Sequence, residues 1–260
     1  MLDLGFLEDV ENILPRIGKN RQISMFSATI NPTIKKLAKE FLNNPVVIEL
    51  TQQRDHVKNI FHKIVLADES KKAELLSYLI GSKNIPQALV FVNQKQEANI
   101  LVENLNLDGL KASCIHGDIR QSNRALALRK FKEKELRVLV CTDIASRGID
   151  IENLPCVINY SLPQSINDFT HRVGRTARAG NSGTAITLLS VKEYPFMNEI
   201  EKELKLIIPK EELEGFEITE KKPKVKIKRN IPLKEKKISN KTKDTQKQKS
   251  NKFRKTTKRG

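Results

Sequence analysis

Cysteine is scarce in this 260-residue chain, and long apolar runs are absent. Cys114, Cys141 and Cys156 form no CxxC pair and show no Cys/His metal spacing, so we expect small buried hydrophobic residues in a reducing compartment, with no metal site. The chain has no apolar run of 18 residues and no basic-then-apolar leader at its start. These absences argue against a membrane span and predict a soluble, cytoplasmic protein.

Acidic residues are also scarce, but only in the last part of the chain. Residues 221–260 contain 18 Lys and Arg against Glu235 and Asp244, whereas the preceding 220 residues contain 29 basic and 29 acidic side chains. The formal net charge of +16 therefore belongs to the end of the chain. Apolar residues are too sparse there to offset the entropy of ordering, so residues 216–260 are predicted to be a disordered Lys-rich tail.

Between these extremes, short β-branched apolar runs alternate with segments of helical spacing. This alternation is typical of βαβ units and predicts an α/β fold, a parallel sheet with helices on both faces. Ligands of such sheets bind beyond the carboxyl ends of the strands. The expected strands are Ile60–Ala67, Ala88–Val92, Ala112–His116, Val138–Thr142, Val157–Tyr160 and Thr184–Leu189, and the expected helices are Lys71–Ile80, Glu97–Leu105 and Gln121–Lys132.

The first fifty residues are too few to bury a core of their own. They contain two short strand candidates, Gln22–Phe26 and Val46–Leu50, around a helix candidate at Pro32–Leu42. We interpret residues 1–50 as the end of an earlier domain and the polar residues 51–57 as a linker. The second domain is then expected over residues 58–215.

The densest cluster of cations is the segment from His171 to Gly180. Arg172, Arg175 and Arg178 follow one another at intervals of three, with two glycines between and after them. Guanidinium groups carry a permanent charge and a planar fork that matches phosphate oxygens. A solvated basic helix face is the alternative, but the glycines and the lack of acids favour phosphate binding.

Two further segments carry weaker signals for ligand binding. The strand Val138–Thr142 leads into a loop that ends at Gly148 and Asp150, where the carboxylate could accept bonds from ribose hydroxyls. A capping Asp beside a turn Gly explains the same residues equally well.

Gln121 and Arg124 lie three apart at the start of a predicted helix, so they share one face near the helix N-terminus. That position suits a phosphate, although ordinary N-capping by Asp118 or Ser122 is the simpler interpretation. The tripeptide Ser27-Ala28-Thr29 after a strand candidate indicates no more than a turn when taken alone.

Together these segments resemble the DEAD-box family of superfamily 2 helicases. The family's motifs occur here in the same order, and the sequences around Ile144–Ile151 and Ile207–Phe216 are most similar to its bacterial RhlE subgroup. The resemblance implies a RecA-like second domain, preceded by the end of a first one. The matching segments are Ser27–Thr29, Leu89–Asn93, Gln121–Arg124, Ala145–Asp150 and His171–Arg178.

The resemblance also implies roles in nucleotide chemistry. Arg175 and Arg178 match the arginine fingers that meet the γ-phosphate of ATP, and Gly148 with Asp150 matches the contact to its ribose. The implied cofactor is ATP with Mg²⁺, bound mainly by the first RecA-like domain. The chain contains neither G-x-x-x-x-G-K-[ST] nor an Asp-Glu-Ala-Asp box, so it is expected to be N-terminally truncated and inactive alone.

Contacts to RNA are implied for Gln121, Arg124 and Thr142, all to the sugar-phosphate backbone. Asp143, which directly follows Thr142, lies in the same RNA-facing loop and could weaken a phosphate contact. Such contacts carry no sequence information, so RNA would be recognised by shape.

Coupling between the two domains is implied for Ser27, Thr29 and His171. The expected partners are RNA and the missing N-terminal RecA-like domain, with ribosomal and RNA-decay complexes both open and no membrane. Two functions remain: part of an ATP-dependent RNA helicase that remodels or unwinds duplexes, or an ATP-independent RNA-binding and annealing module. The basic tail would add sequence-independent RNA affinity, and a solubilising appendage without a partner is the alternative.

Overall fold

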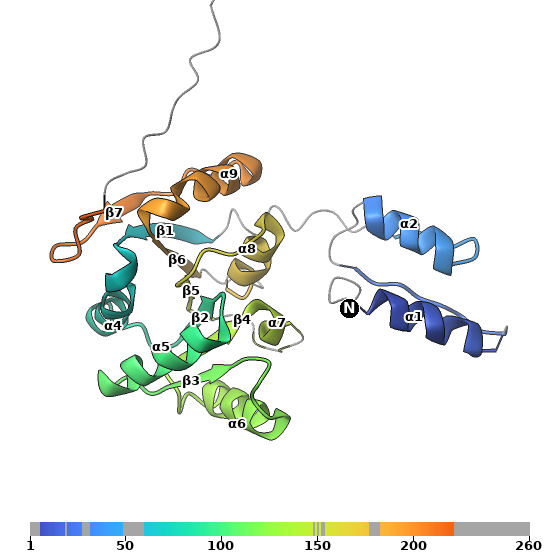
Figure 1. Cartoon of the computed structure of the whole chain (residues 1–260), viewed down its shortest axis with the longest axis horizontal. Helices are drawn as coiled ribbons and strands as arrows, with labels where there is room; N and C mark the ends of the chain where they lie inside the picture. Colours follow the sequence, from blue (N-terminus) through green and yellow to red (C-terminus); the bar gives the residue numbers. More distant parts are fainter. Residues whose placement is uncertain are drawn as a thin grey trace, which may run out of the picture. The chain divides into compact units, whose positions relative to one another are not determined.

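The computed structural model describes residues 6–18, 20–27, 32–48, 60–147, 149, 151, 154–176 and 183–220. The chain divides into two compact units, residues 1–57 and residues 58–260 (Figure 1). In the described part of the chain, no helix is both long enough and apolar enough to cross a membrane.

The larger unit is built on a seven-stranded sheet in the order β3-β4-β2-β5-β6-β1-β7. Every pairing between neighbouring strands is parallel, which confirms the predicted α/β architecture. β7 was not predicted, since its three residues are charged and only add an edge to β1. The strands are β1 (Phe61–Leu66), β2 (Ala88–Val92), β3 (Ala112–Ile115), β4 (Val138–Thr142), β5 (Cys156–Asn159), β6 (Thr184–Leu189) and β7 (Lys210–Glu212).

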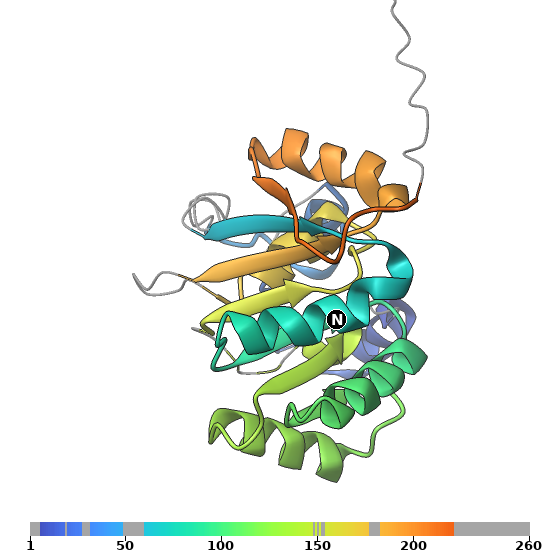
Figure 2. The ribbon, with the colours of Figure 1, turned by 90° about the vertical axis from the view of Figure 1, so that its left-hand side faces the viewer.

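Helices cover both faces of this sheet, as Figure 1 shows. Successive strand residues point to opposite faces, so β2 sends Val90 into one core and Phe91 into the other. The first core is closed by α4 (Lys72–Ser82) and α5 (Lys95–Leu107), the side from which Figure 2 views the sheet. The second core lies under α6 (Gln121–Lys132) and α7 (Asp143–Ser146).

α8 (Ile166–Val173) lies on the same face as α6 and α7. Its Phe169 is fully buried and stacks on His62 of β1, with ring centroids 6.1 Å apart. Neither α8 nor α9 (Tyr194–Leu204) was predicted as a helix. α8 carries the first part of the arginine cluster, so its placement positions the candidate site.

The ordered chain continues past the predicted domain end at residue 215. Phe216 is buried in the α4/α5 core, with its ring centroid 5.6 Å from that of Tyr78. Asp68, just after β1, then accepts hydrogen bonds from the backbone N–H groups of Thr219 and Glu220. The Thr219 bonds hold the pKa of Asp68 below its ordinary value. Residues 216–220 are therefore part of the folded domain, and residues 221–260 lie outside the described residues.

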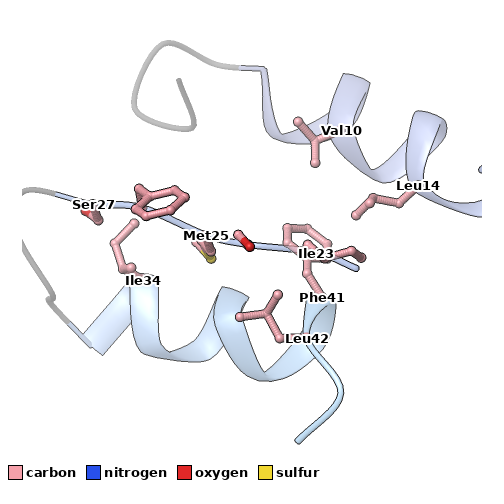
Figure 3. Close-up of a pocket in the computed structure, with 10 residues that line it drawn as sticks. Val10, Leu14, Ile23, Met25, Ser27, Ile34, Phe41 and Leu42 are labelled. Atoms are coloured by element: carbon pink, nitrogen blue, oxygen red, sulfur yellow. The ribbon is translucent and has the colours of Figure 1, made fainter. Parts of the chain in front are cut away.

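The smaller unit contains α1 (Leu7–Ile13), the 3-10 helix η2 (Leu14–Arg16) and α2 (Pro32–Phe41). The predicted strand Gln22–Phe26 is wrong as a strand, because among the described residues it pairs with no other segment. Its Ile23, Met25 and Ser27 instead line a pocket with apolar side chains of α1 and α2 (Figure 3). Residues 46–48 of the second predicted strand are likewise unpaired and exposed, and the rest of it lies outside the described residues.

Replacing Phe216 by alanine should lower the free energy of unfolding by about 3 kcal/mol, because it leaves a cavity beside Tyr78. Urea denaturation followed by circular dichroism measures this. The control is Ile207→Ala, at a side chain that is 99% exposed, which should change stability by less than about 0.5 kcal/mol. Equal stabilities for the two variants would show that residue 216 is not part of the core.

Candidate functional site

A buried arginine, Arg172 on α8, is the centre of the polar residues at the carboxyl edge of the sheet. Only 1% of it is exposed. Its Nε and Nη2 donate to the two carboxylate oxygens of Asp143, both at 2.6 Å. Nη2 also donates to Asn93 Oδ1 at 2.8 Å, and Nη1 donates to the Ser161 carbonyl at 2.6 Å. The guanidinium lies 5.2 Å from the centre of the Phe91 ring, a cation–π distance.

These bonds tie together four parts of the fold. Asn93 follows β2, Asp143 follows β4 and Ser161 follows β5, while Arg172 itself comes from α8. A buried charge is tolerated only when it is paired and its donors are satisfied, and the planar fork of arginine meets several acceptors in fixed directions. Arg172 therefore fixes the loops beyond three adjacent strands relative to α8.

The structure pairs Asp143 with an internal cation. The sequence places this residue in the loop expected to face RNA, and both of its oxygens accept from the buried Arg172. The same finding identifies Arg172 as a residue that sequence reasoning missed. Arg172 is the first arginine of the cluster that the sequence revealed, yet charge alone does not tell an inward arginine from an outward one.

Arg175 lies immediately beyond the end of α8. Its Nη1 donates to the Ile149 carbonyl at 3.0 Å, and its own carbonyl accepts from the Leu154 N–H at 3.2 Å. Gly174 makes this exit possible, since a Cβ there would lie 3.0 Å from the Thr170 carbonyl oxygen. The guanidinium is thus held against the loop that follows α7. Arg178, Gly148 and Asp150, the other predicted nucleotide contacts, lie outside the described residues.

The three predicted RNA contacts come from two neighbouring elements. Arg124 Nη2 donates to the carbonyl of Ala145 in α7 at 3.2 Å, and Thr142 ends β4 immediately before α7. Gln121 Oε1 accepts from Arg124 Nη1 at 3.4 Å, a long contact. The structure therefore brings Gln121 and Arg124 to the start of the loop that carries Thr142 and Asp143.

The simpler explanation of these helix-start residues, N-capping by Asp118 or Ser122, is not what the structure shows. The N-cap of α6 is Arg120, and no side chain caps it. Asp118 instead accepts from Lys95 Nζ at 2.7 Å, a bond that holds its pKa below the ordinary value.

The residues expected to couple the domains are separated in the chain. His171 is an exposed residue near the end of α8, Ser27 belongs to the smaller unit, and Thr29 lies outside the described residues. The thiols of Cys141 and Cys156 are free and buried, and burial raises their pKa, that of Cys156 to about 12. Among the residues with described positions, no group of three His, Cys, Asp or Glu side chains could hold a metal ion.

Known proteins similar to this chain are helicases of one family. Residues 71–180 match the family model described as helicase conserved C-terminal domain. The chain is 38% identical over 205 residues to the DEAD-box ATP-dependent RNA helicase CshA of Geobacillus kaustophilus, covering 79% of this chain and 44% of CshA. It is 30% identical to a solved structure of the E. coli DEAD-box protein SrmB, with a TM-score of 0.60, covering 63% of this chain and 97% of that one.

The chain belongs to the DEAD-box RNA helicase family. A structure of S. cerevisiae Dbp5 bound to RNA and ADP BeF3 is also similar to this helicase chain, with 28% identity, a TM-score of 0.71, and coverage of 80% of this chain and 56% of that one. The relatives include CshA, DbpA and RhpA proteins, so the similarity is not specific to the RhlE subgroup. The chain spans less than half the length of these curated relatives.

The Asp143→Asn variant of this helicase chain should be less stable by about 3 kcal/mol, because it leaves the Arg172 charge buried without a counter-ion. Urea denaturation at neutral pH measures the difference. Glu133→Gln is the matched control, since it also converts a carboxylate to an amide but in an exposed pair, Arg129–Glu133 at 3.7 Å, and should change stability by less than about 0.5 kcal/mol. A loss for Asp143→Asn no larger than that of the control would contradict the role assigned to Arg172.

Proposed function

We propose that this chain is the C-terminal part of an ATP-dependent RNA helicase, which remodels or unwinds RNA duplexes when joined to a domain that binds ATP. One observation carries the proposal. The Arg172–Asp143 pair fixes the segment after β4, next to the predicted RNA contacts, to α8, which ends two residues before the predicted finger Arg175. A helicase needs this kind of rigid link, because nucleotide and RNA must favour the same arrangement of the two domains.

In this proposal Arg175 and Arg178 act as arginine fingers, while Gly148 and Asp150 contact the ribose. The guanidinium of Arg175 is permanently charged and planar, and its bond to the Ile149 carbonyl holds it beside the loop after α7. Such a group fits a phosphate. ATP with Mg²⁺ supplies the phosphoryl group and its leaving group when bound. In other phosphoryl-transfer enzymes, arginine fingers increase the rate by about 10³–10⁵.

Gln121, Arg124 and Thr142 contact the sugar-phosphate backbone of RNA, so recognition is independent of sequence. Ser27 and Thr29 couple ATP hydrolysis to unwinding, and His171 helps to link the two domains. We assign residues 1–50 to the end of a first RecA-like domain and residues 51–57 to a linker. The Lys-rich tail adds affinity through counterion release.

The chain alone is proposed to be inactive, because its sequence has no P-loop and no Asp-Glu-Ala-Asp box. That same absence favours the second candidate, an ATP-independent RNA-binding and annealing module. Free buried thiols support a reducing, cytoplasmic location. Two more specific proposals are membership of the RhlE subgroup and a role in ribosomal or RNA-decay complexes. The first rests on the sequence around Ile144–Ile151.

The test is RNA-stimulated ATP hydrolysis by a mixture of this chain and a separately expressed first RecA-like domain of a DEAD-box protein. The mixture should hydrolyse ATP, the chain alone should not, and Arg175→Ala should lower the rate by about 10³-fold. Lys83→Ala is the control, since it removes a charge from an exposed position after α4, and it should leave the rate unchanged.

Two results would decide against the proposal. Hydrolysis by the chain alone would refute its inactivity, and hydrolysis by the mixture that survives Arg175→Ala would refute the finger. RNA binding without hydrolysis in any mixture would favour the annealing module.

A further inference from the structure

A basic groove runs along one face of α6, from Gln121 and Arg124, assigned to RNA above, toward the C-terminal end of the helix. It encloses about 600 Å³ between this helix and the loop after α7. Its rim holds four cations, Arg124, Arg129, Lys132 and Arg147, against a single acid, Glu133. Ala125, Leu128 and Ile149 add an apolar floor. The volume is within the range of ligand-binding clefts, and the charge of the rim calls for an anion.

The helical spacing explains how these cations come to share one face. Gln121, Arg124, Leu128 and Lys132 lie at i, i+3, i+7 and i+11, whereas the buried Phe131 points into the core. At 1.5 Å per residue, Gln121 and Lys132 are about 16 Å apart along the helix axis. That stripe is longer than a single phosphate group, so it suits an extended polyanion.

The alternative is a solvated basic face without a ligand. Two pairs occupy part of the rim, Arg129–Glu133 at 3.7 Å and Arg147–Asp168 at 3.3 Å. Such partly exposed pairs contribute little, so a polyanion can replace them. A plain solvated face also needs no apolar floor and no second element. Moreover, Arg124 Nε is buried and makes no hydrogen bond within the described part of the chain, although a guanidinium N–H ordinarily finds an acceptor.

We propose that this groove is a second sugar-phosphate subsite, which binds the single-stranded RNA backbone next to the nucleotides held by Gln121 and Arg124. The inference rests on the proposed RNA-binding function and extends it along α6. Arg129 and Lys132 contact phosphates, and the floor of Leu128 and Ile149 packs against the sugars. Grooves of this kind follow a single strand without reading its sequence.

The test is the salt dependence of RNA binding by the full 260-residue chain, with single-stranded oligonucleotides of two unrelated sequences. Each phosphate contact to a single strand contributes about 0.7 to the slope of log K against log salt concentration. The double variant Arg129→Gln/Lys132→Gln should therefore lower the slope by about 1.4. At 0.1 M salt this corresponds to about 25-fold weaker binding of both sequences.

The matched control is Lys111→Gln/Lys130→Gln, which removes the same net charge from positions outside the groove. It should leave the slope within about 0.3 of that of the unmodified chain, because non-contacting charges release few counterions. Arg129→Lys/Lys132→Arg keeps both charges and should keep the slope, which separates a contact from a folding defect.

A third variant, Thr142→Ala, separates the groove from the proposed function, because Thr142 is a proposed RNA contact that does not line the groove. If Thr142→Ala weakens binding while the Arg129/Lys132 pair behaves like its control, the groove proposal is overturned and the RNA function stands. If neither changes binding, both fail. A reduced slope for the Arg129/Lys132 pair alone, with the control unchanged, supports the groove.

Discussion

In this helicase domain, the placement of the loops at the carboxyl edge of the sheet relative to α8 depends on one buried cation, Arg172. Arg172 is almost completely removed from water. Within the described part of the chain, Asp143 is its counter-ion, and neutral acceptors at the ends of β2 and β5 take its other N–H groups. Burying the Arg172 charge carries a desolvation penalty that its pairing with the partly buried Asp143 has to offset, so the pair is not needed for stability as such. The pair instead fixes geometry, because a planar guanidinium with several fixed acceptors allows one relative placement of the loops and α8.

Two consequences follow for the site. Arg175 leaves α8 from a position that Arg172 fixes one turn earlier, and Gly174 lets the chain turn against the Thr170 carbonyl. On the other side, Arg124 reaches the carbonyl of Ala145, two residues after Asp143. The proposed phosphate-binding residues are thus attached to one rigid edge rather than to independent loops. Such preorganisation suits side chains that must meet a ligand in one fixed geometry.

The central strands could be predicted from sequence because β-branched runs such as Val138–Thr142 are buried on both sides and leave little ambiguity. Four elements could not be predicted: the strand β7 and the helices α7, α8 and α9. β7 and α7 are only three and four residues long. On α8, the residues of the arginine motif were interpreted as a ligand-binding cluster and not as part of a helix. The strand predicted at Gln22–Phe26 has the right composition, but a strand exists only when another segment pairs with it. Asp143 shows a further limit: sequence located the loop, yet the direction of its side chain depends on Arg172, 29 residues away.

The most direct test of the central claim replaces the ion pair by apolar residues of similar size, Arg172→Met with Asp143→Leu. If Arg172 acts by positioning, this double variant should fold with a stability within about 2 kcal/mol of the original, since no charge is left buried and unpaired. Its RNA-stimulated ATP hydrolysis, measured in the presence of a first RecA-like domain, should nevertheless fall about 100-fold, the loss expected when reacting groups are misplaced by about 1 Å. A folded double variant with hydrolysis within twofold of the original would contradict the account.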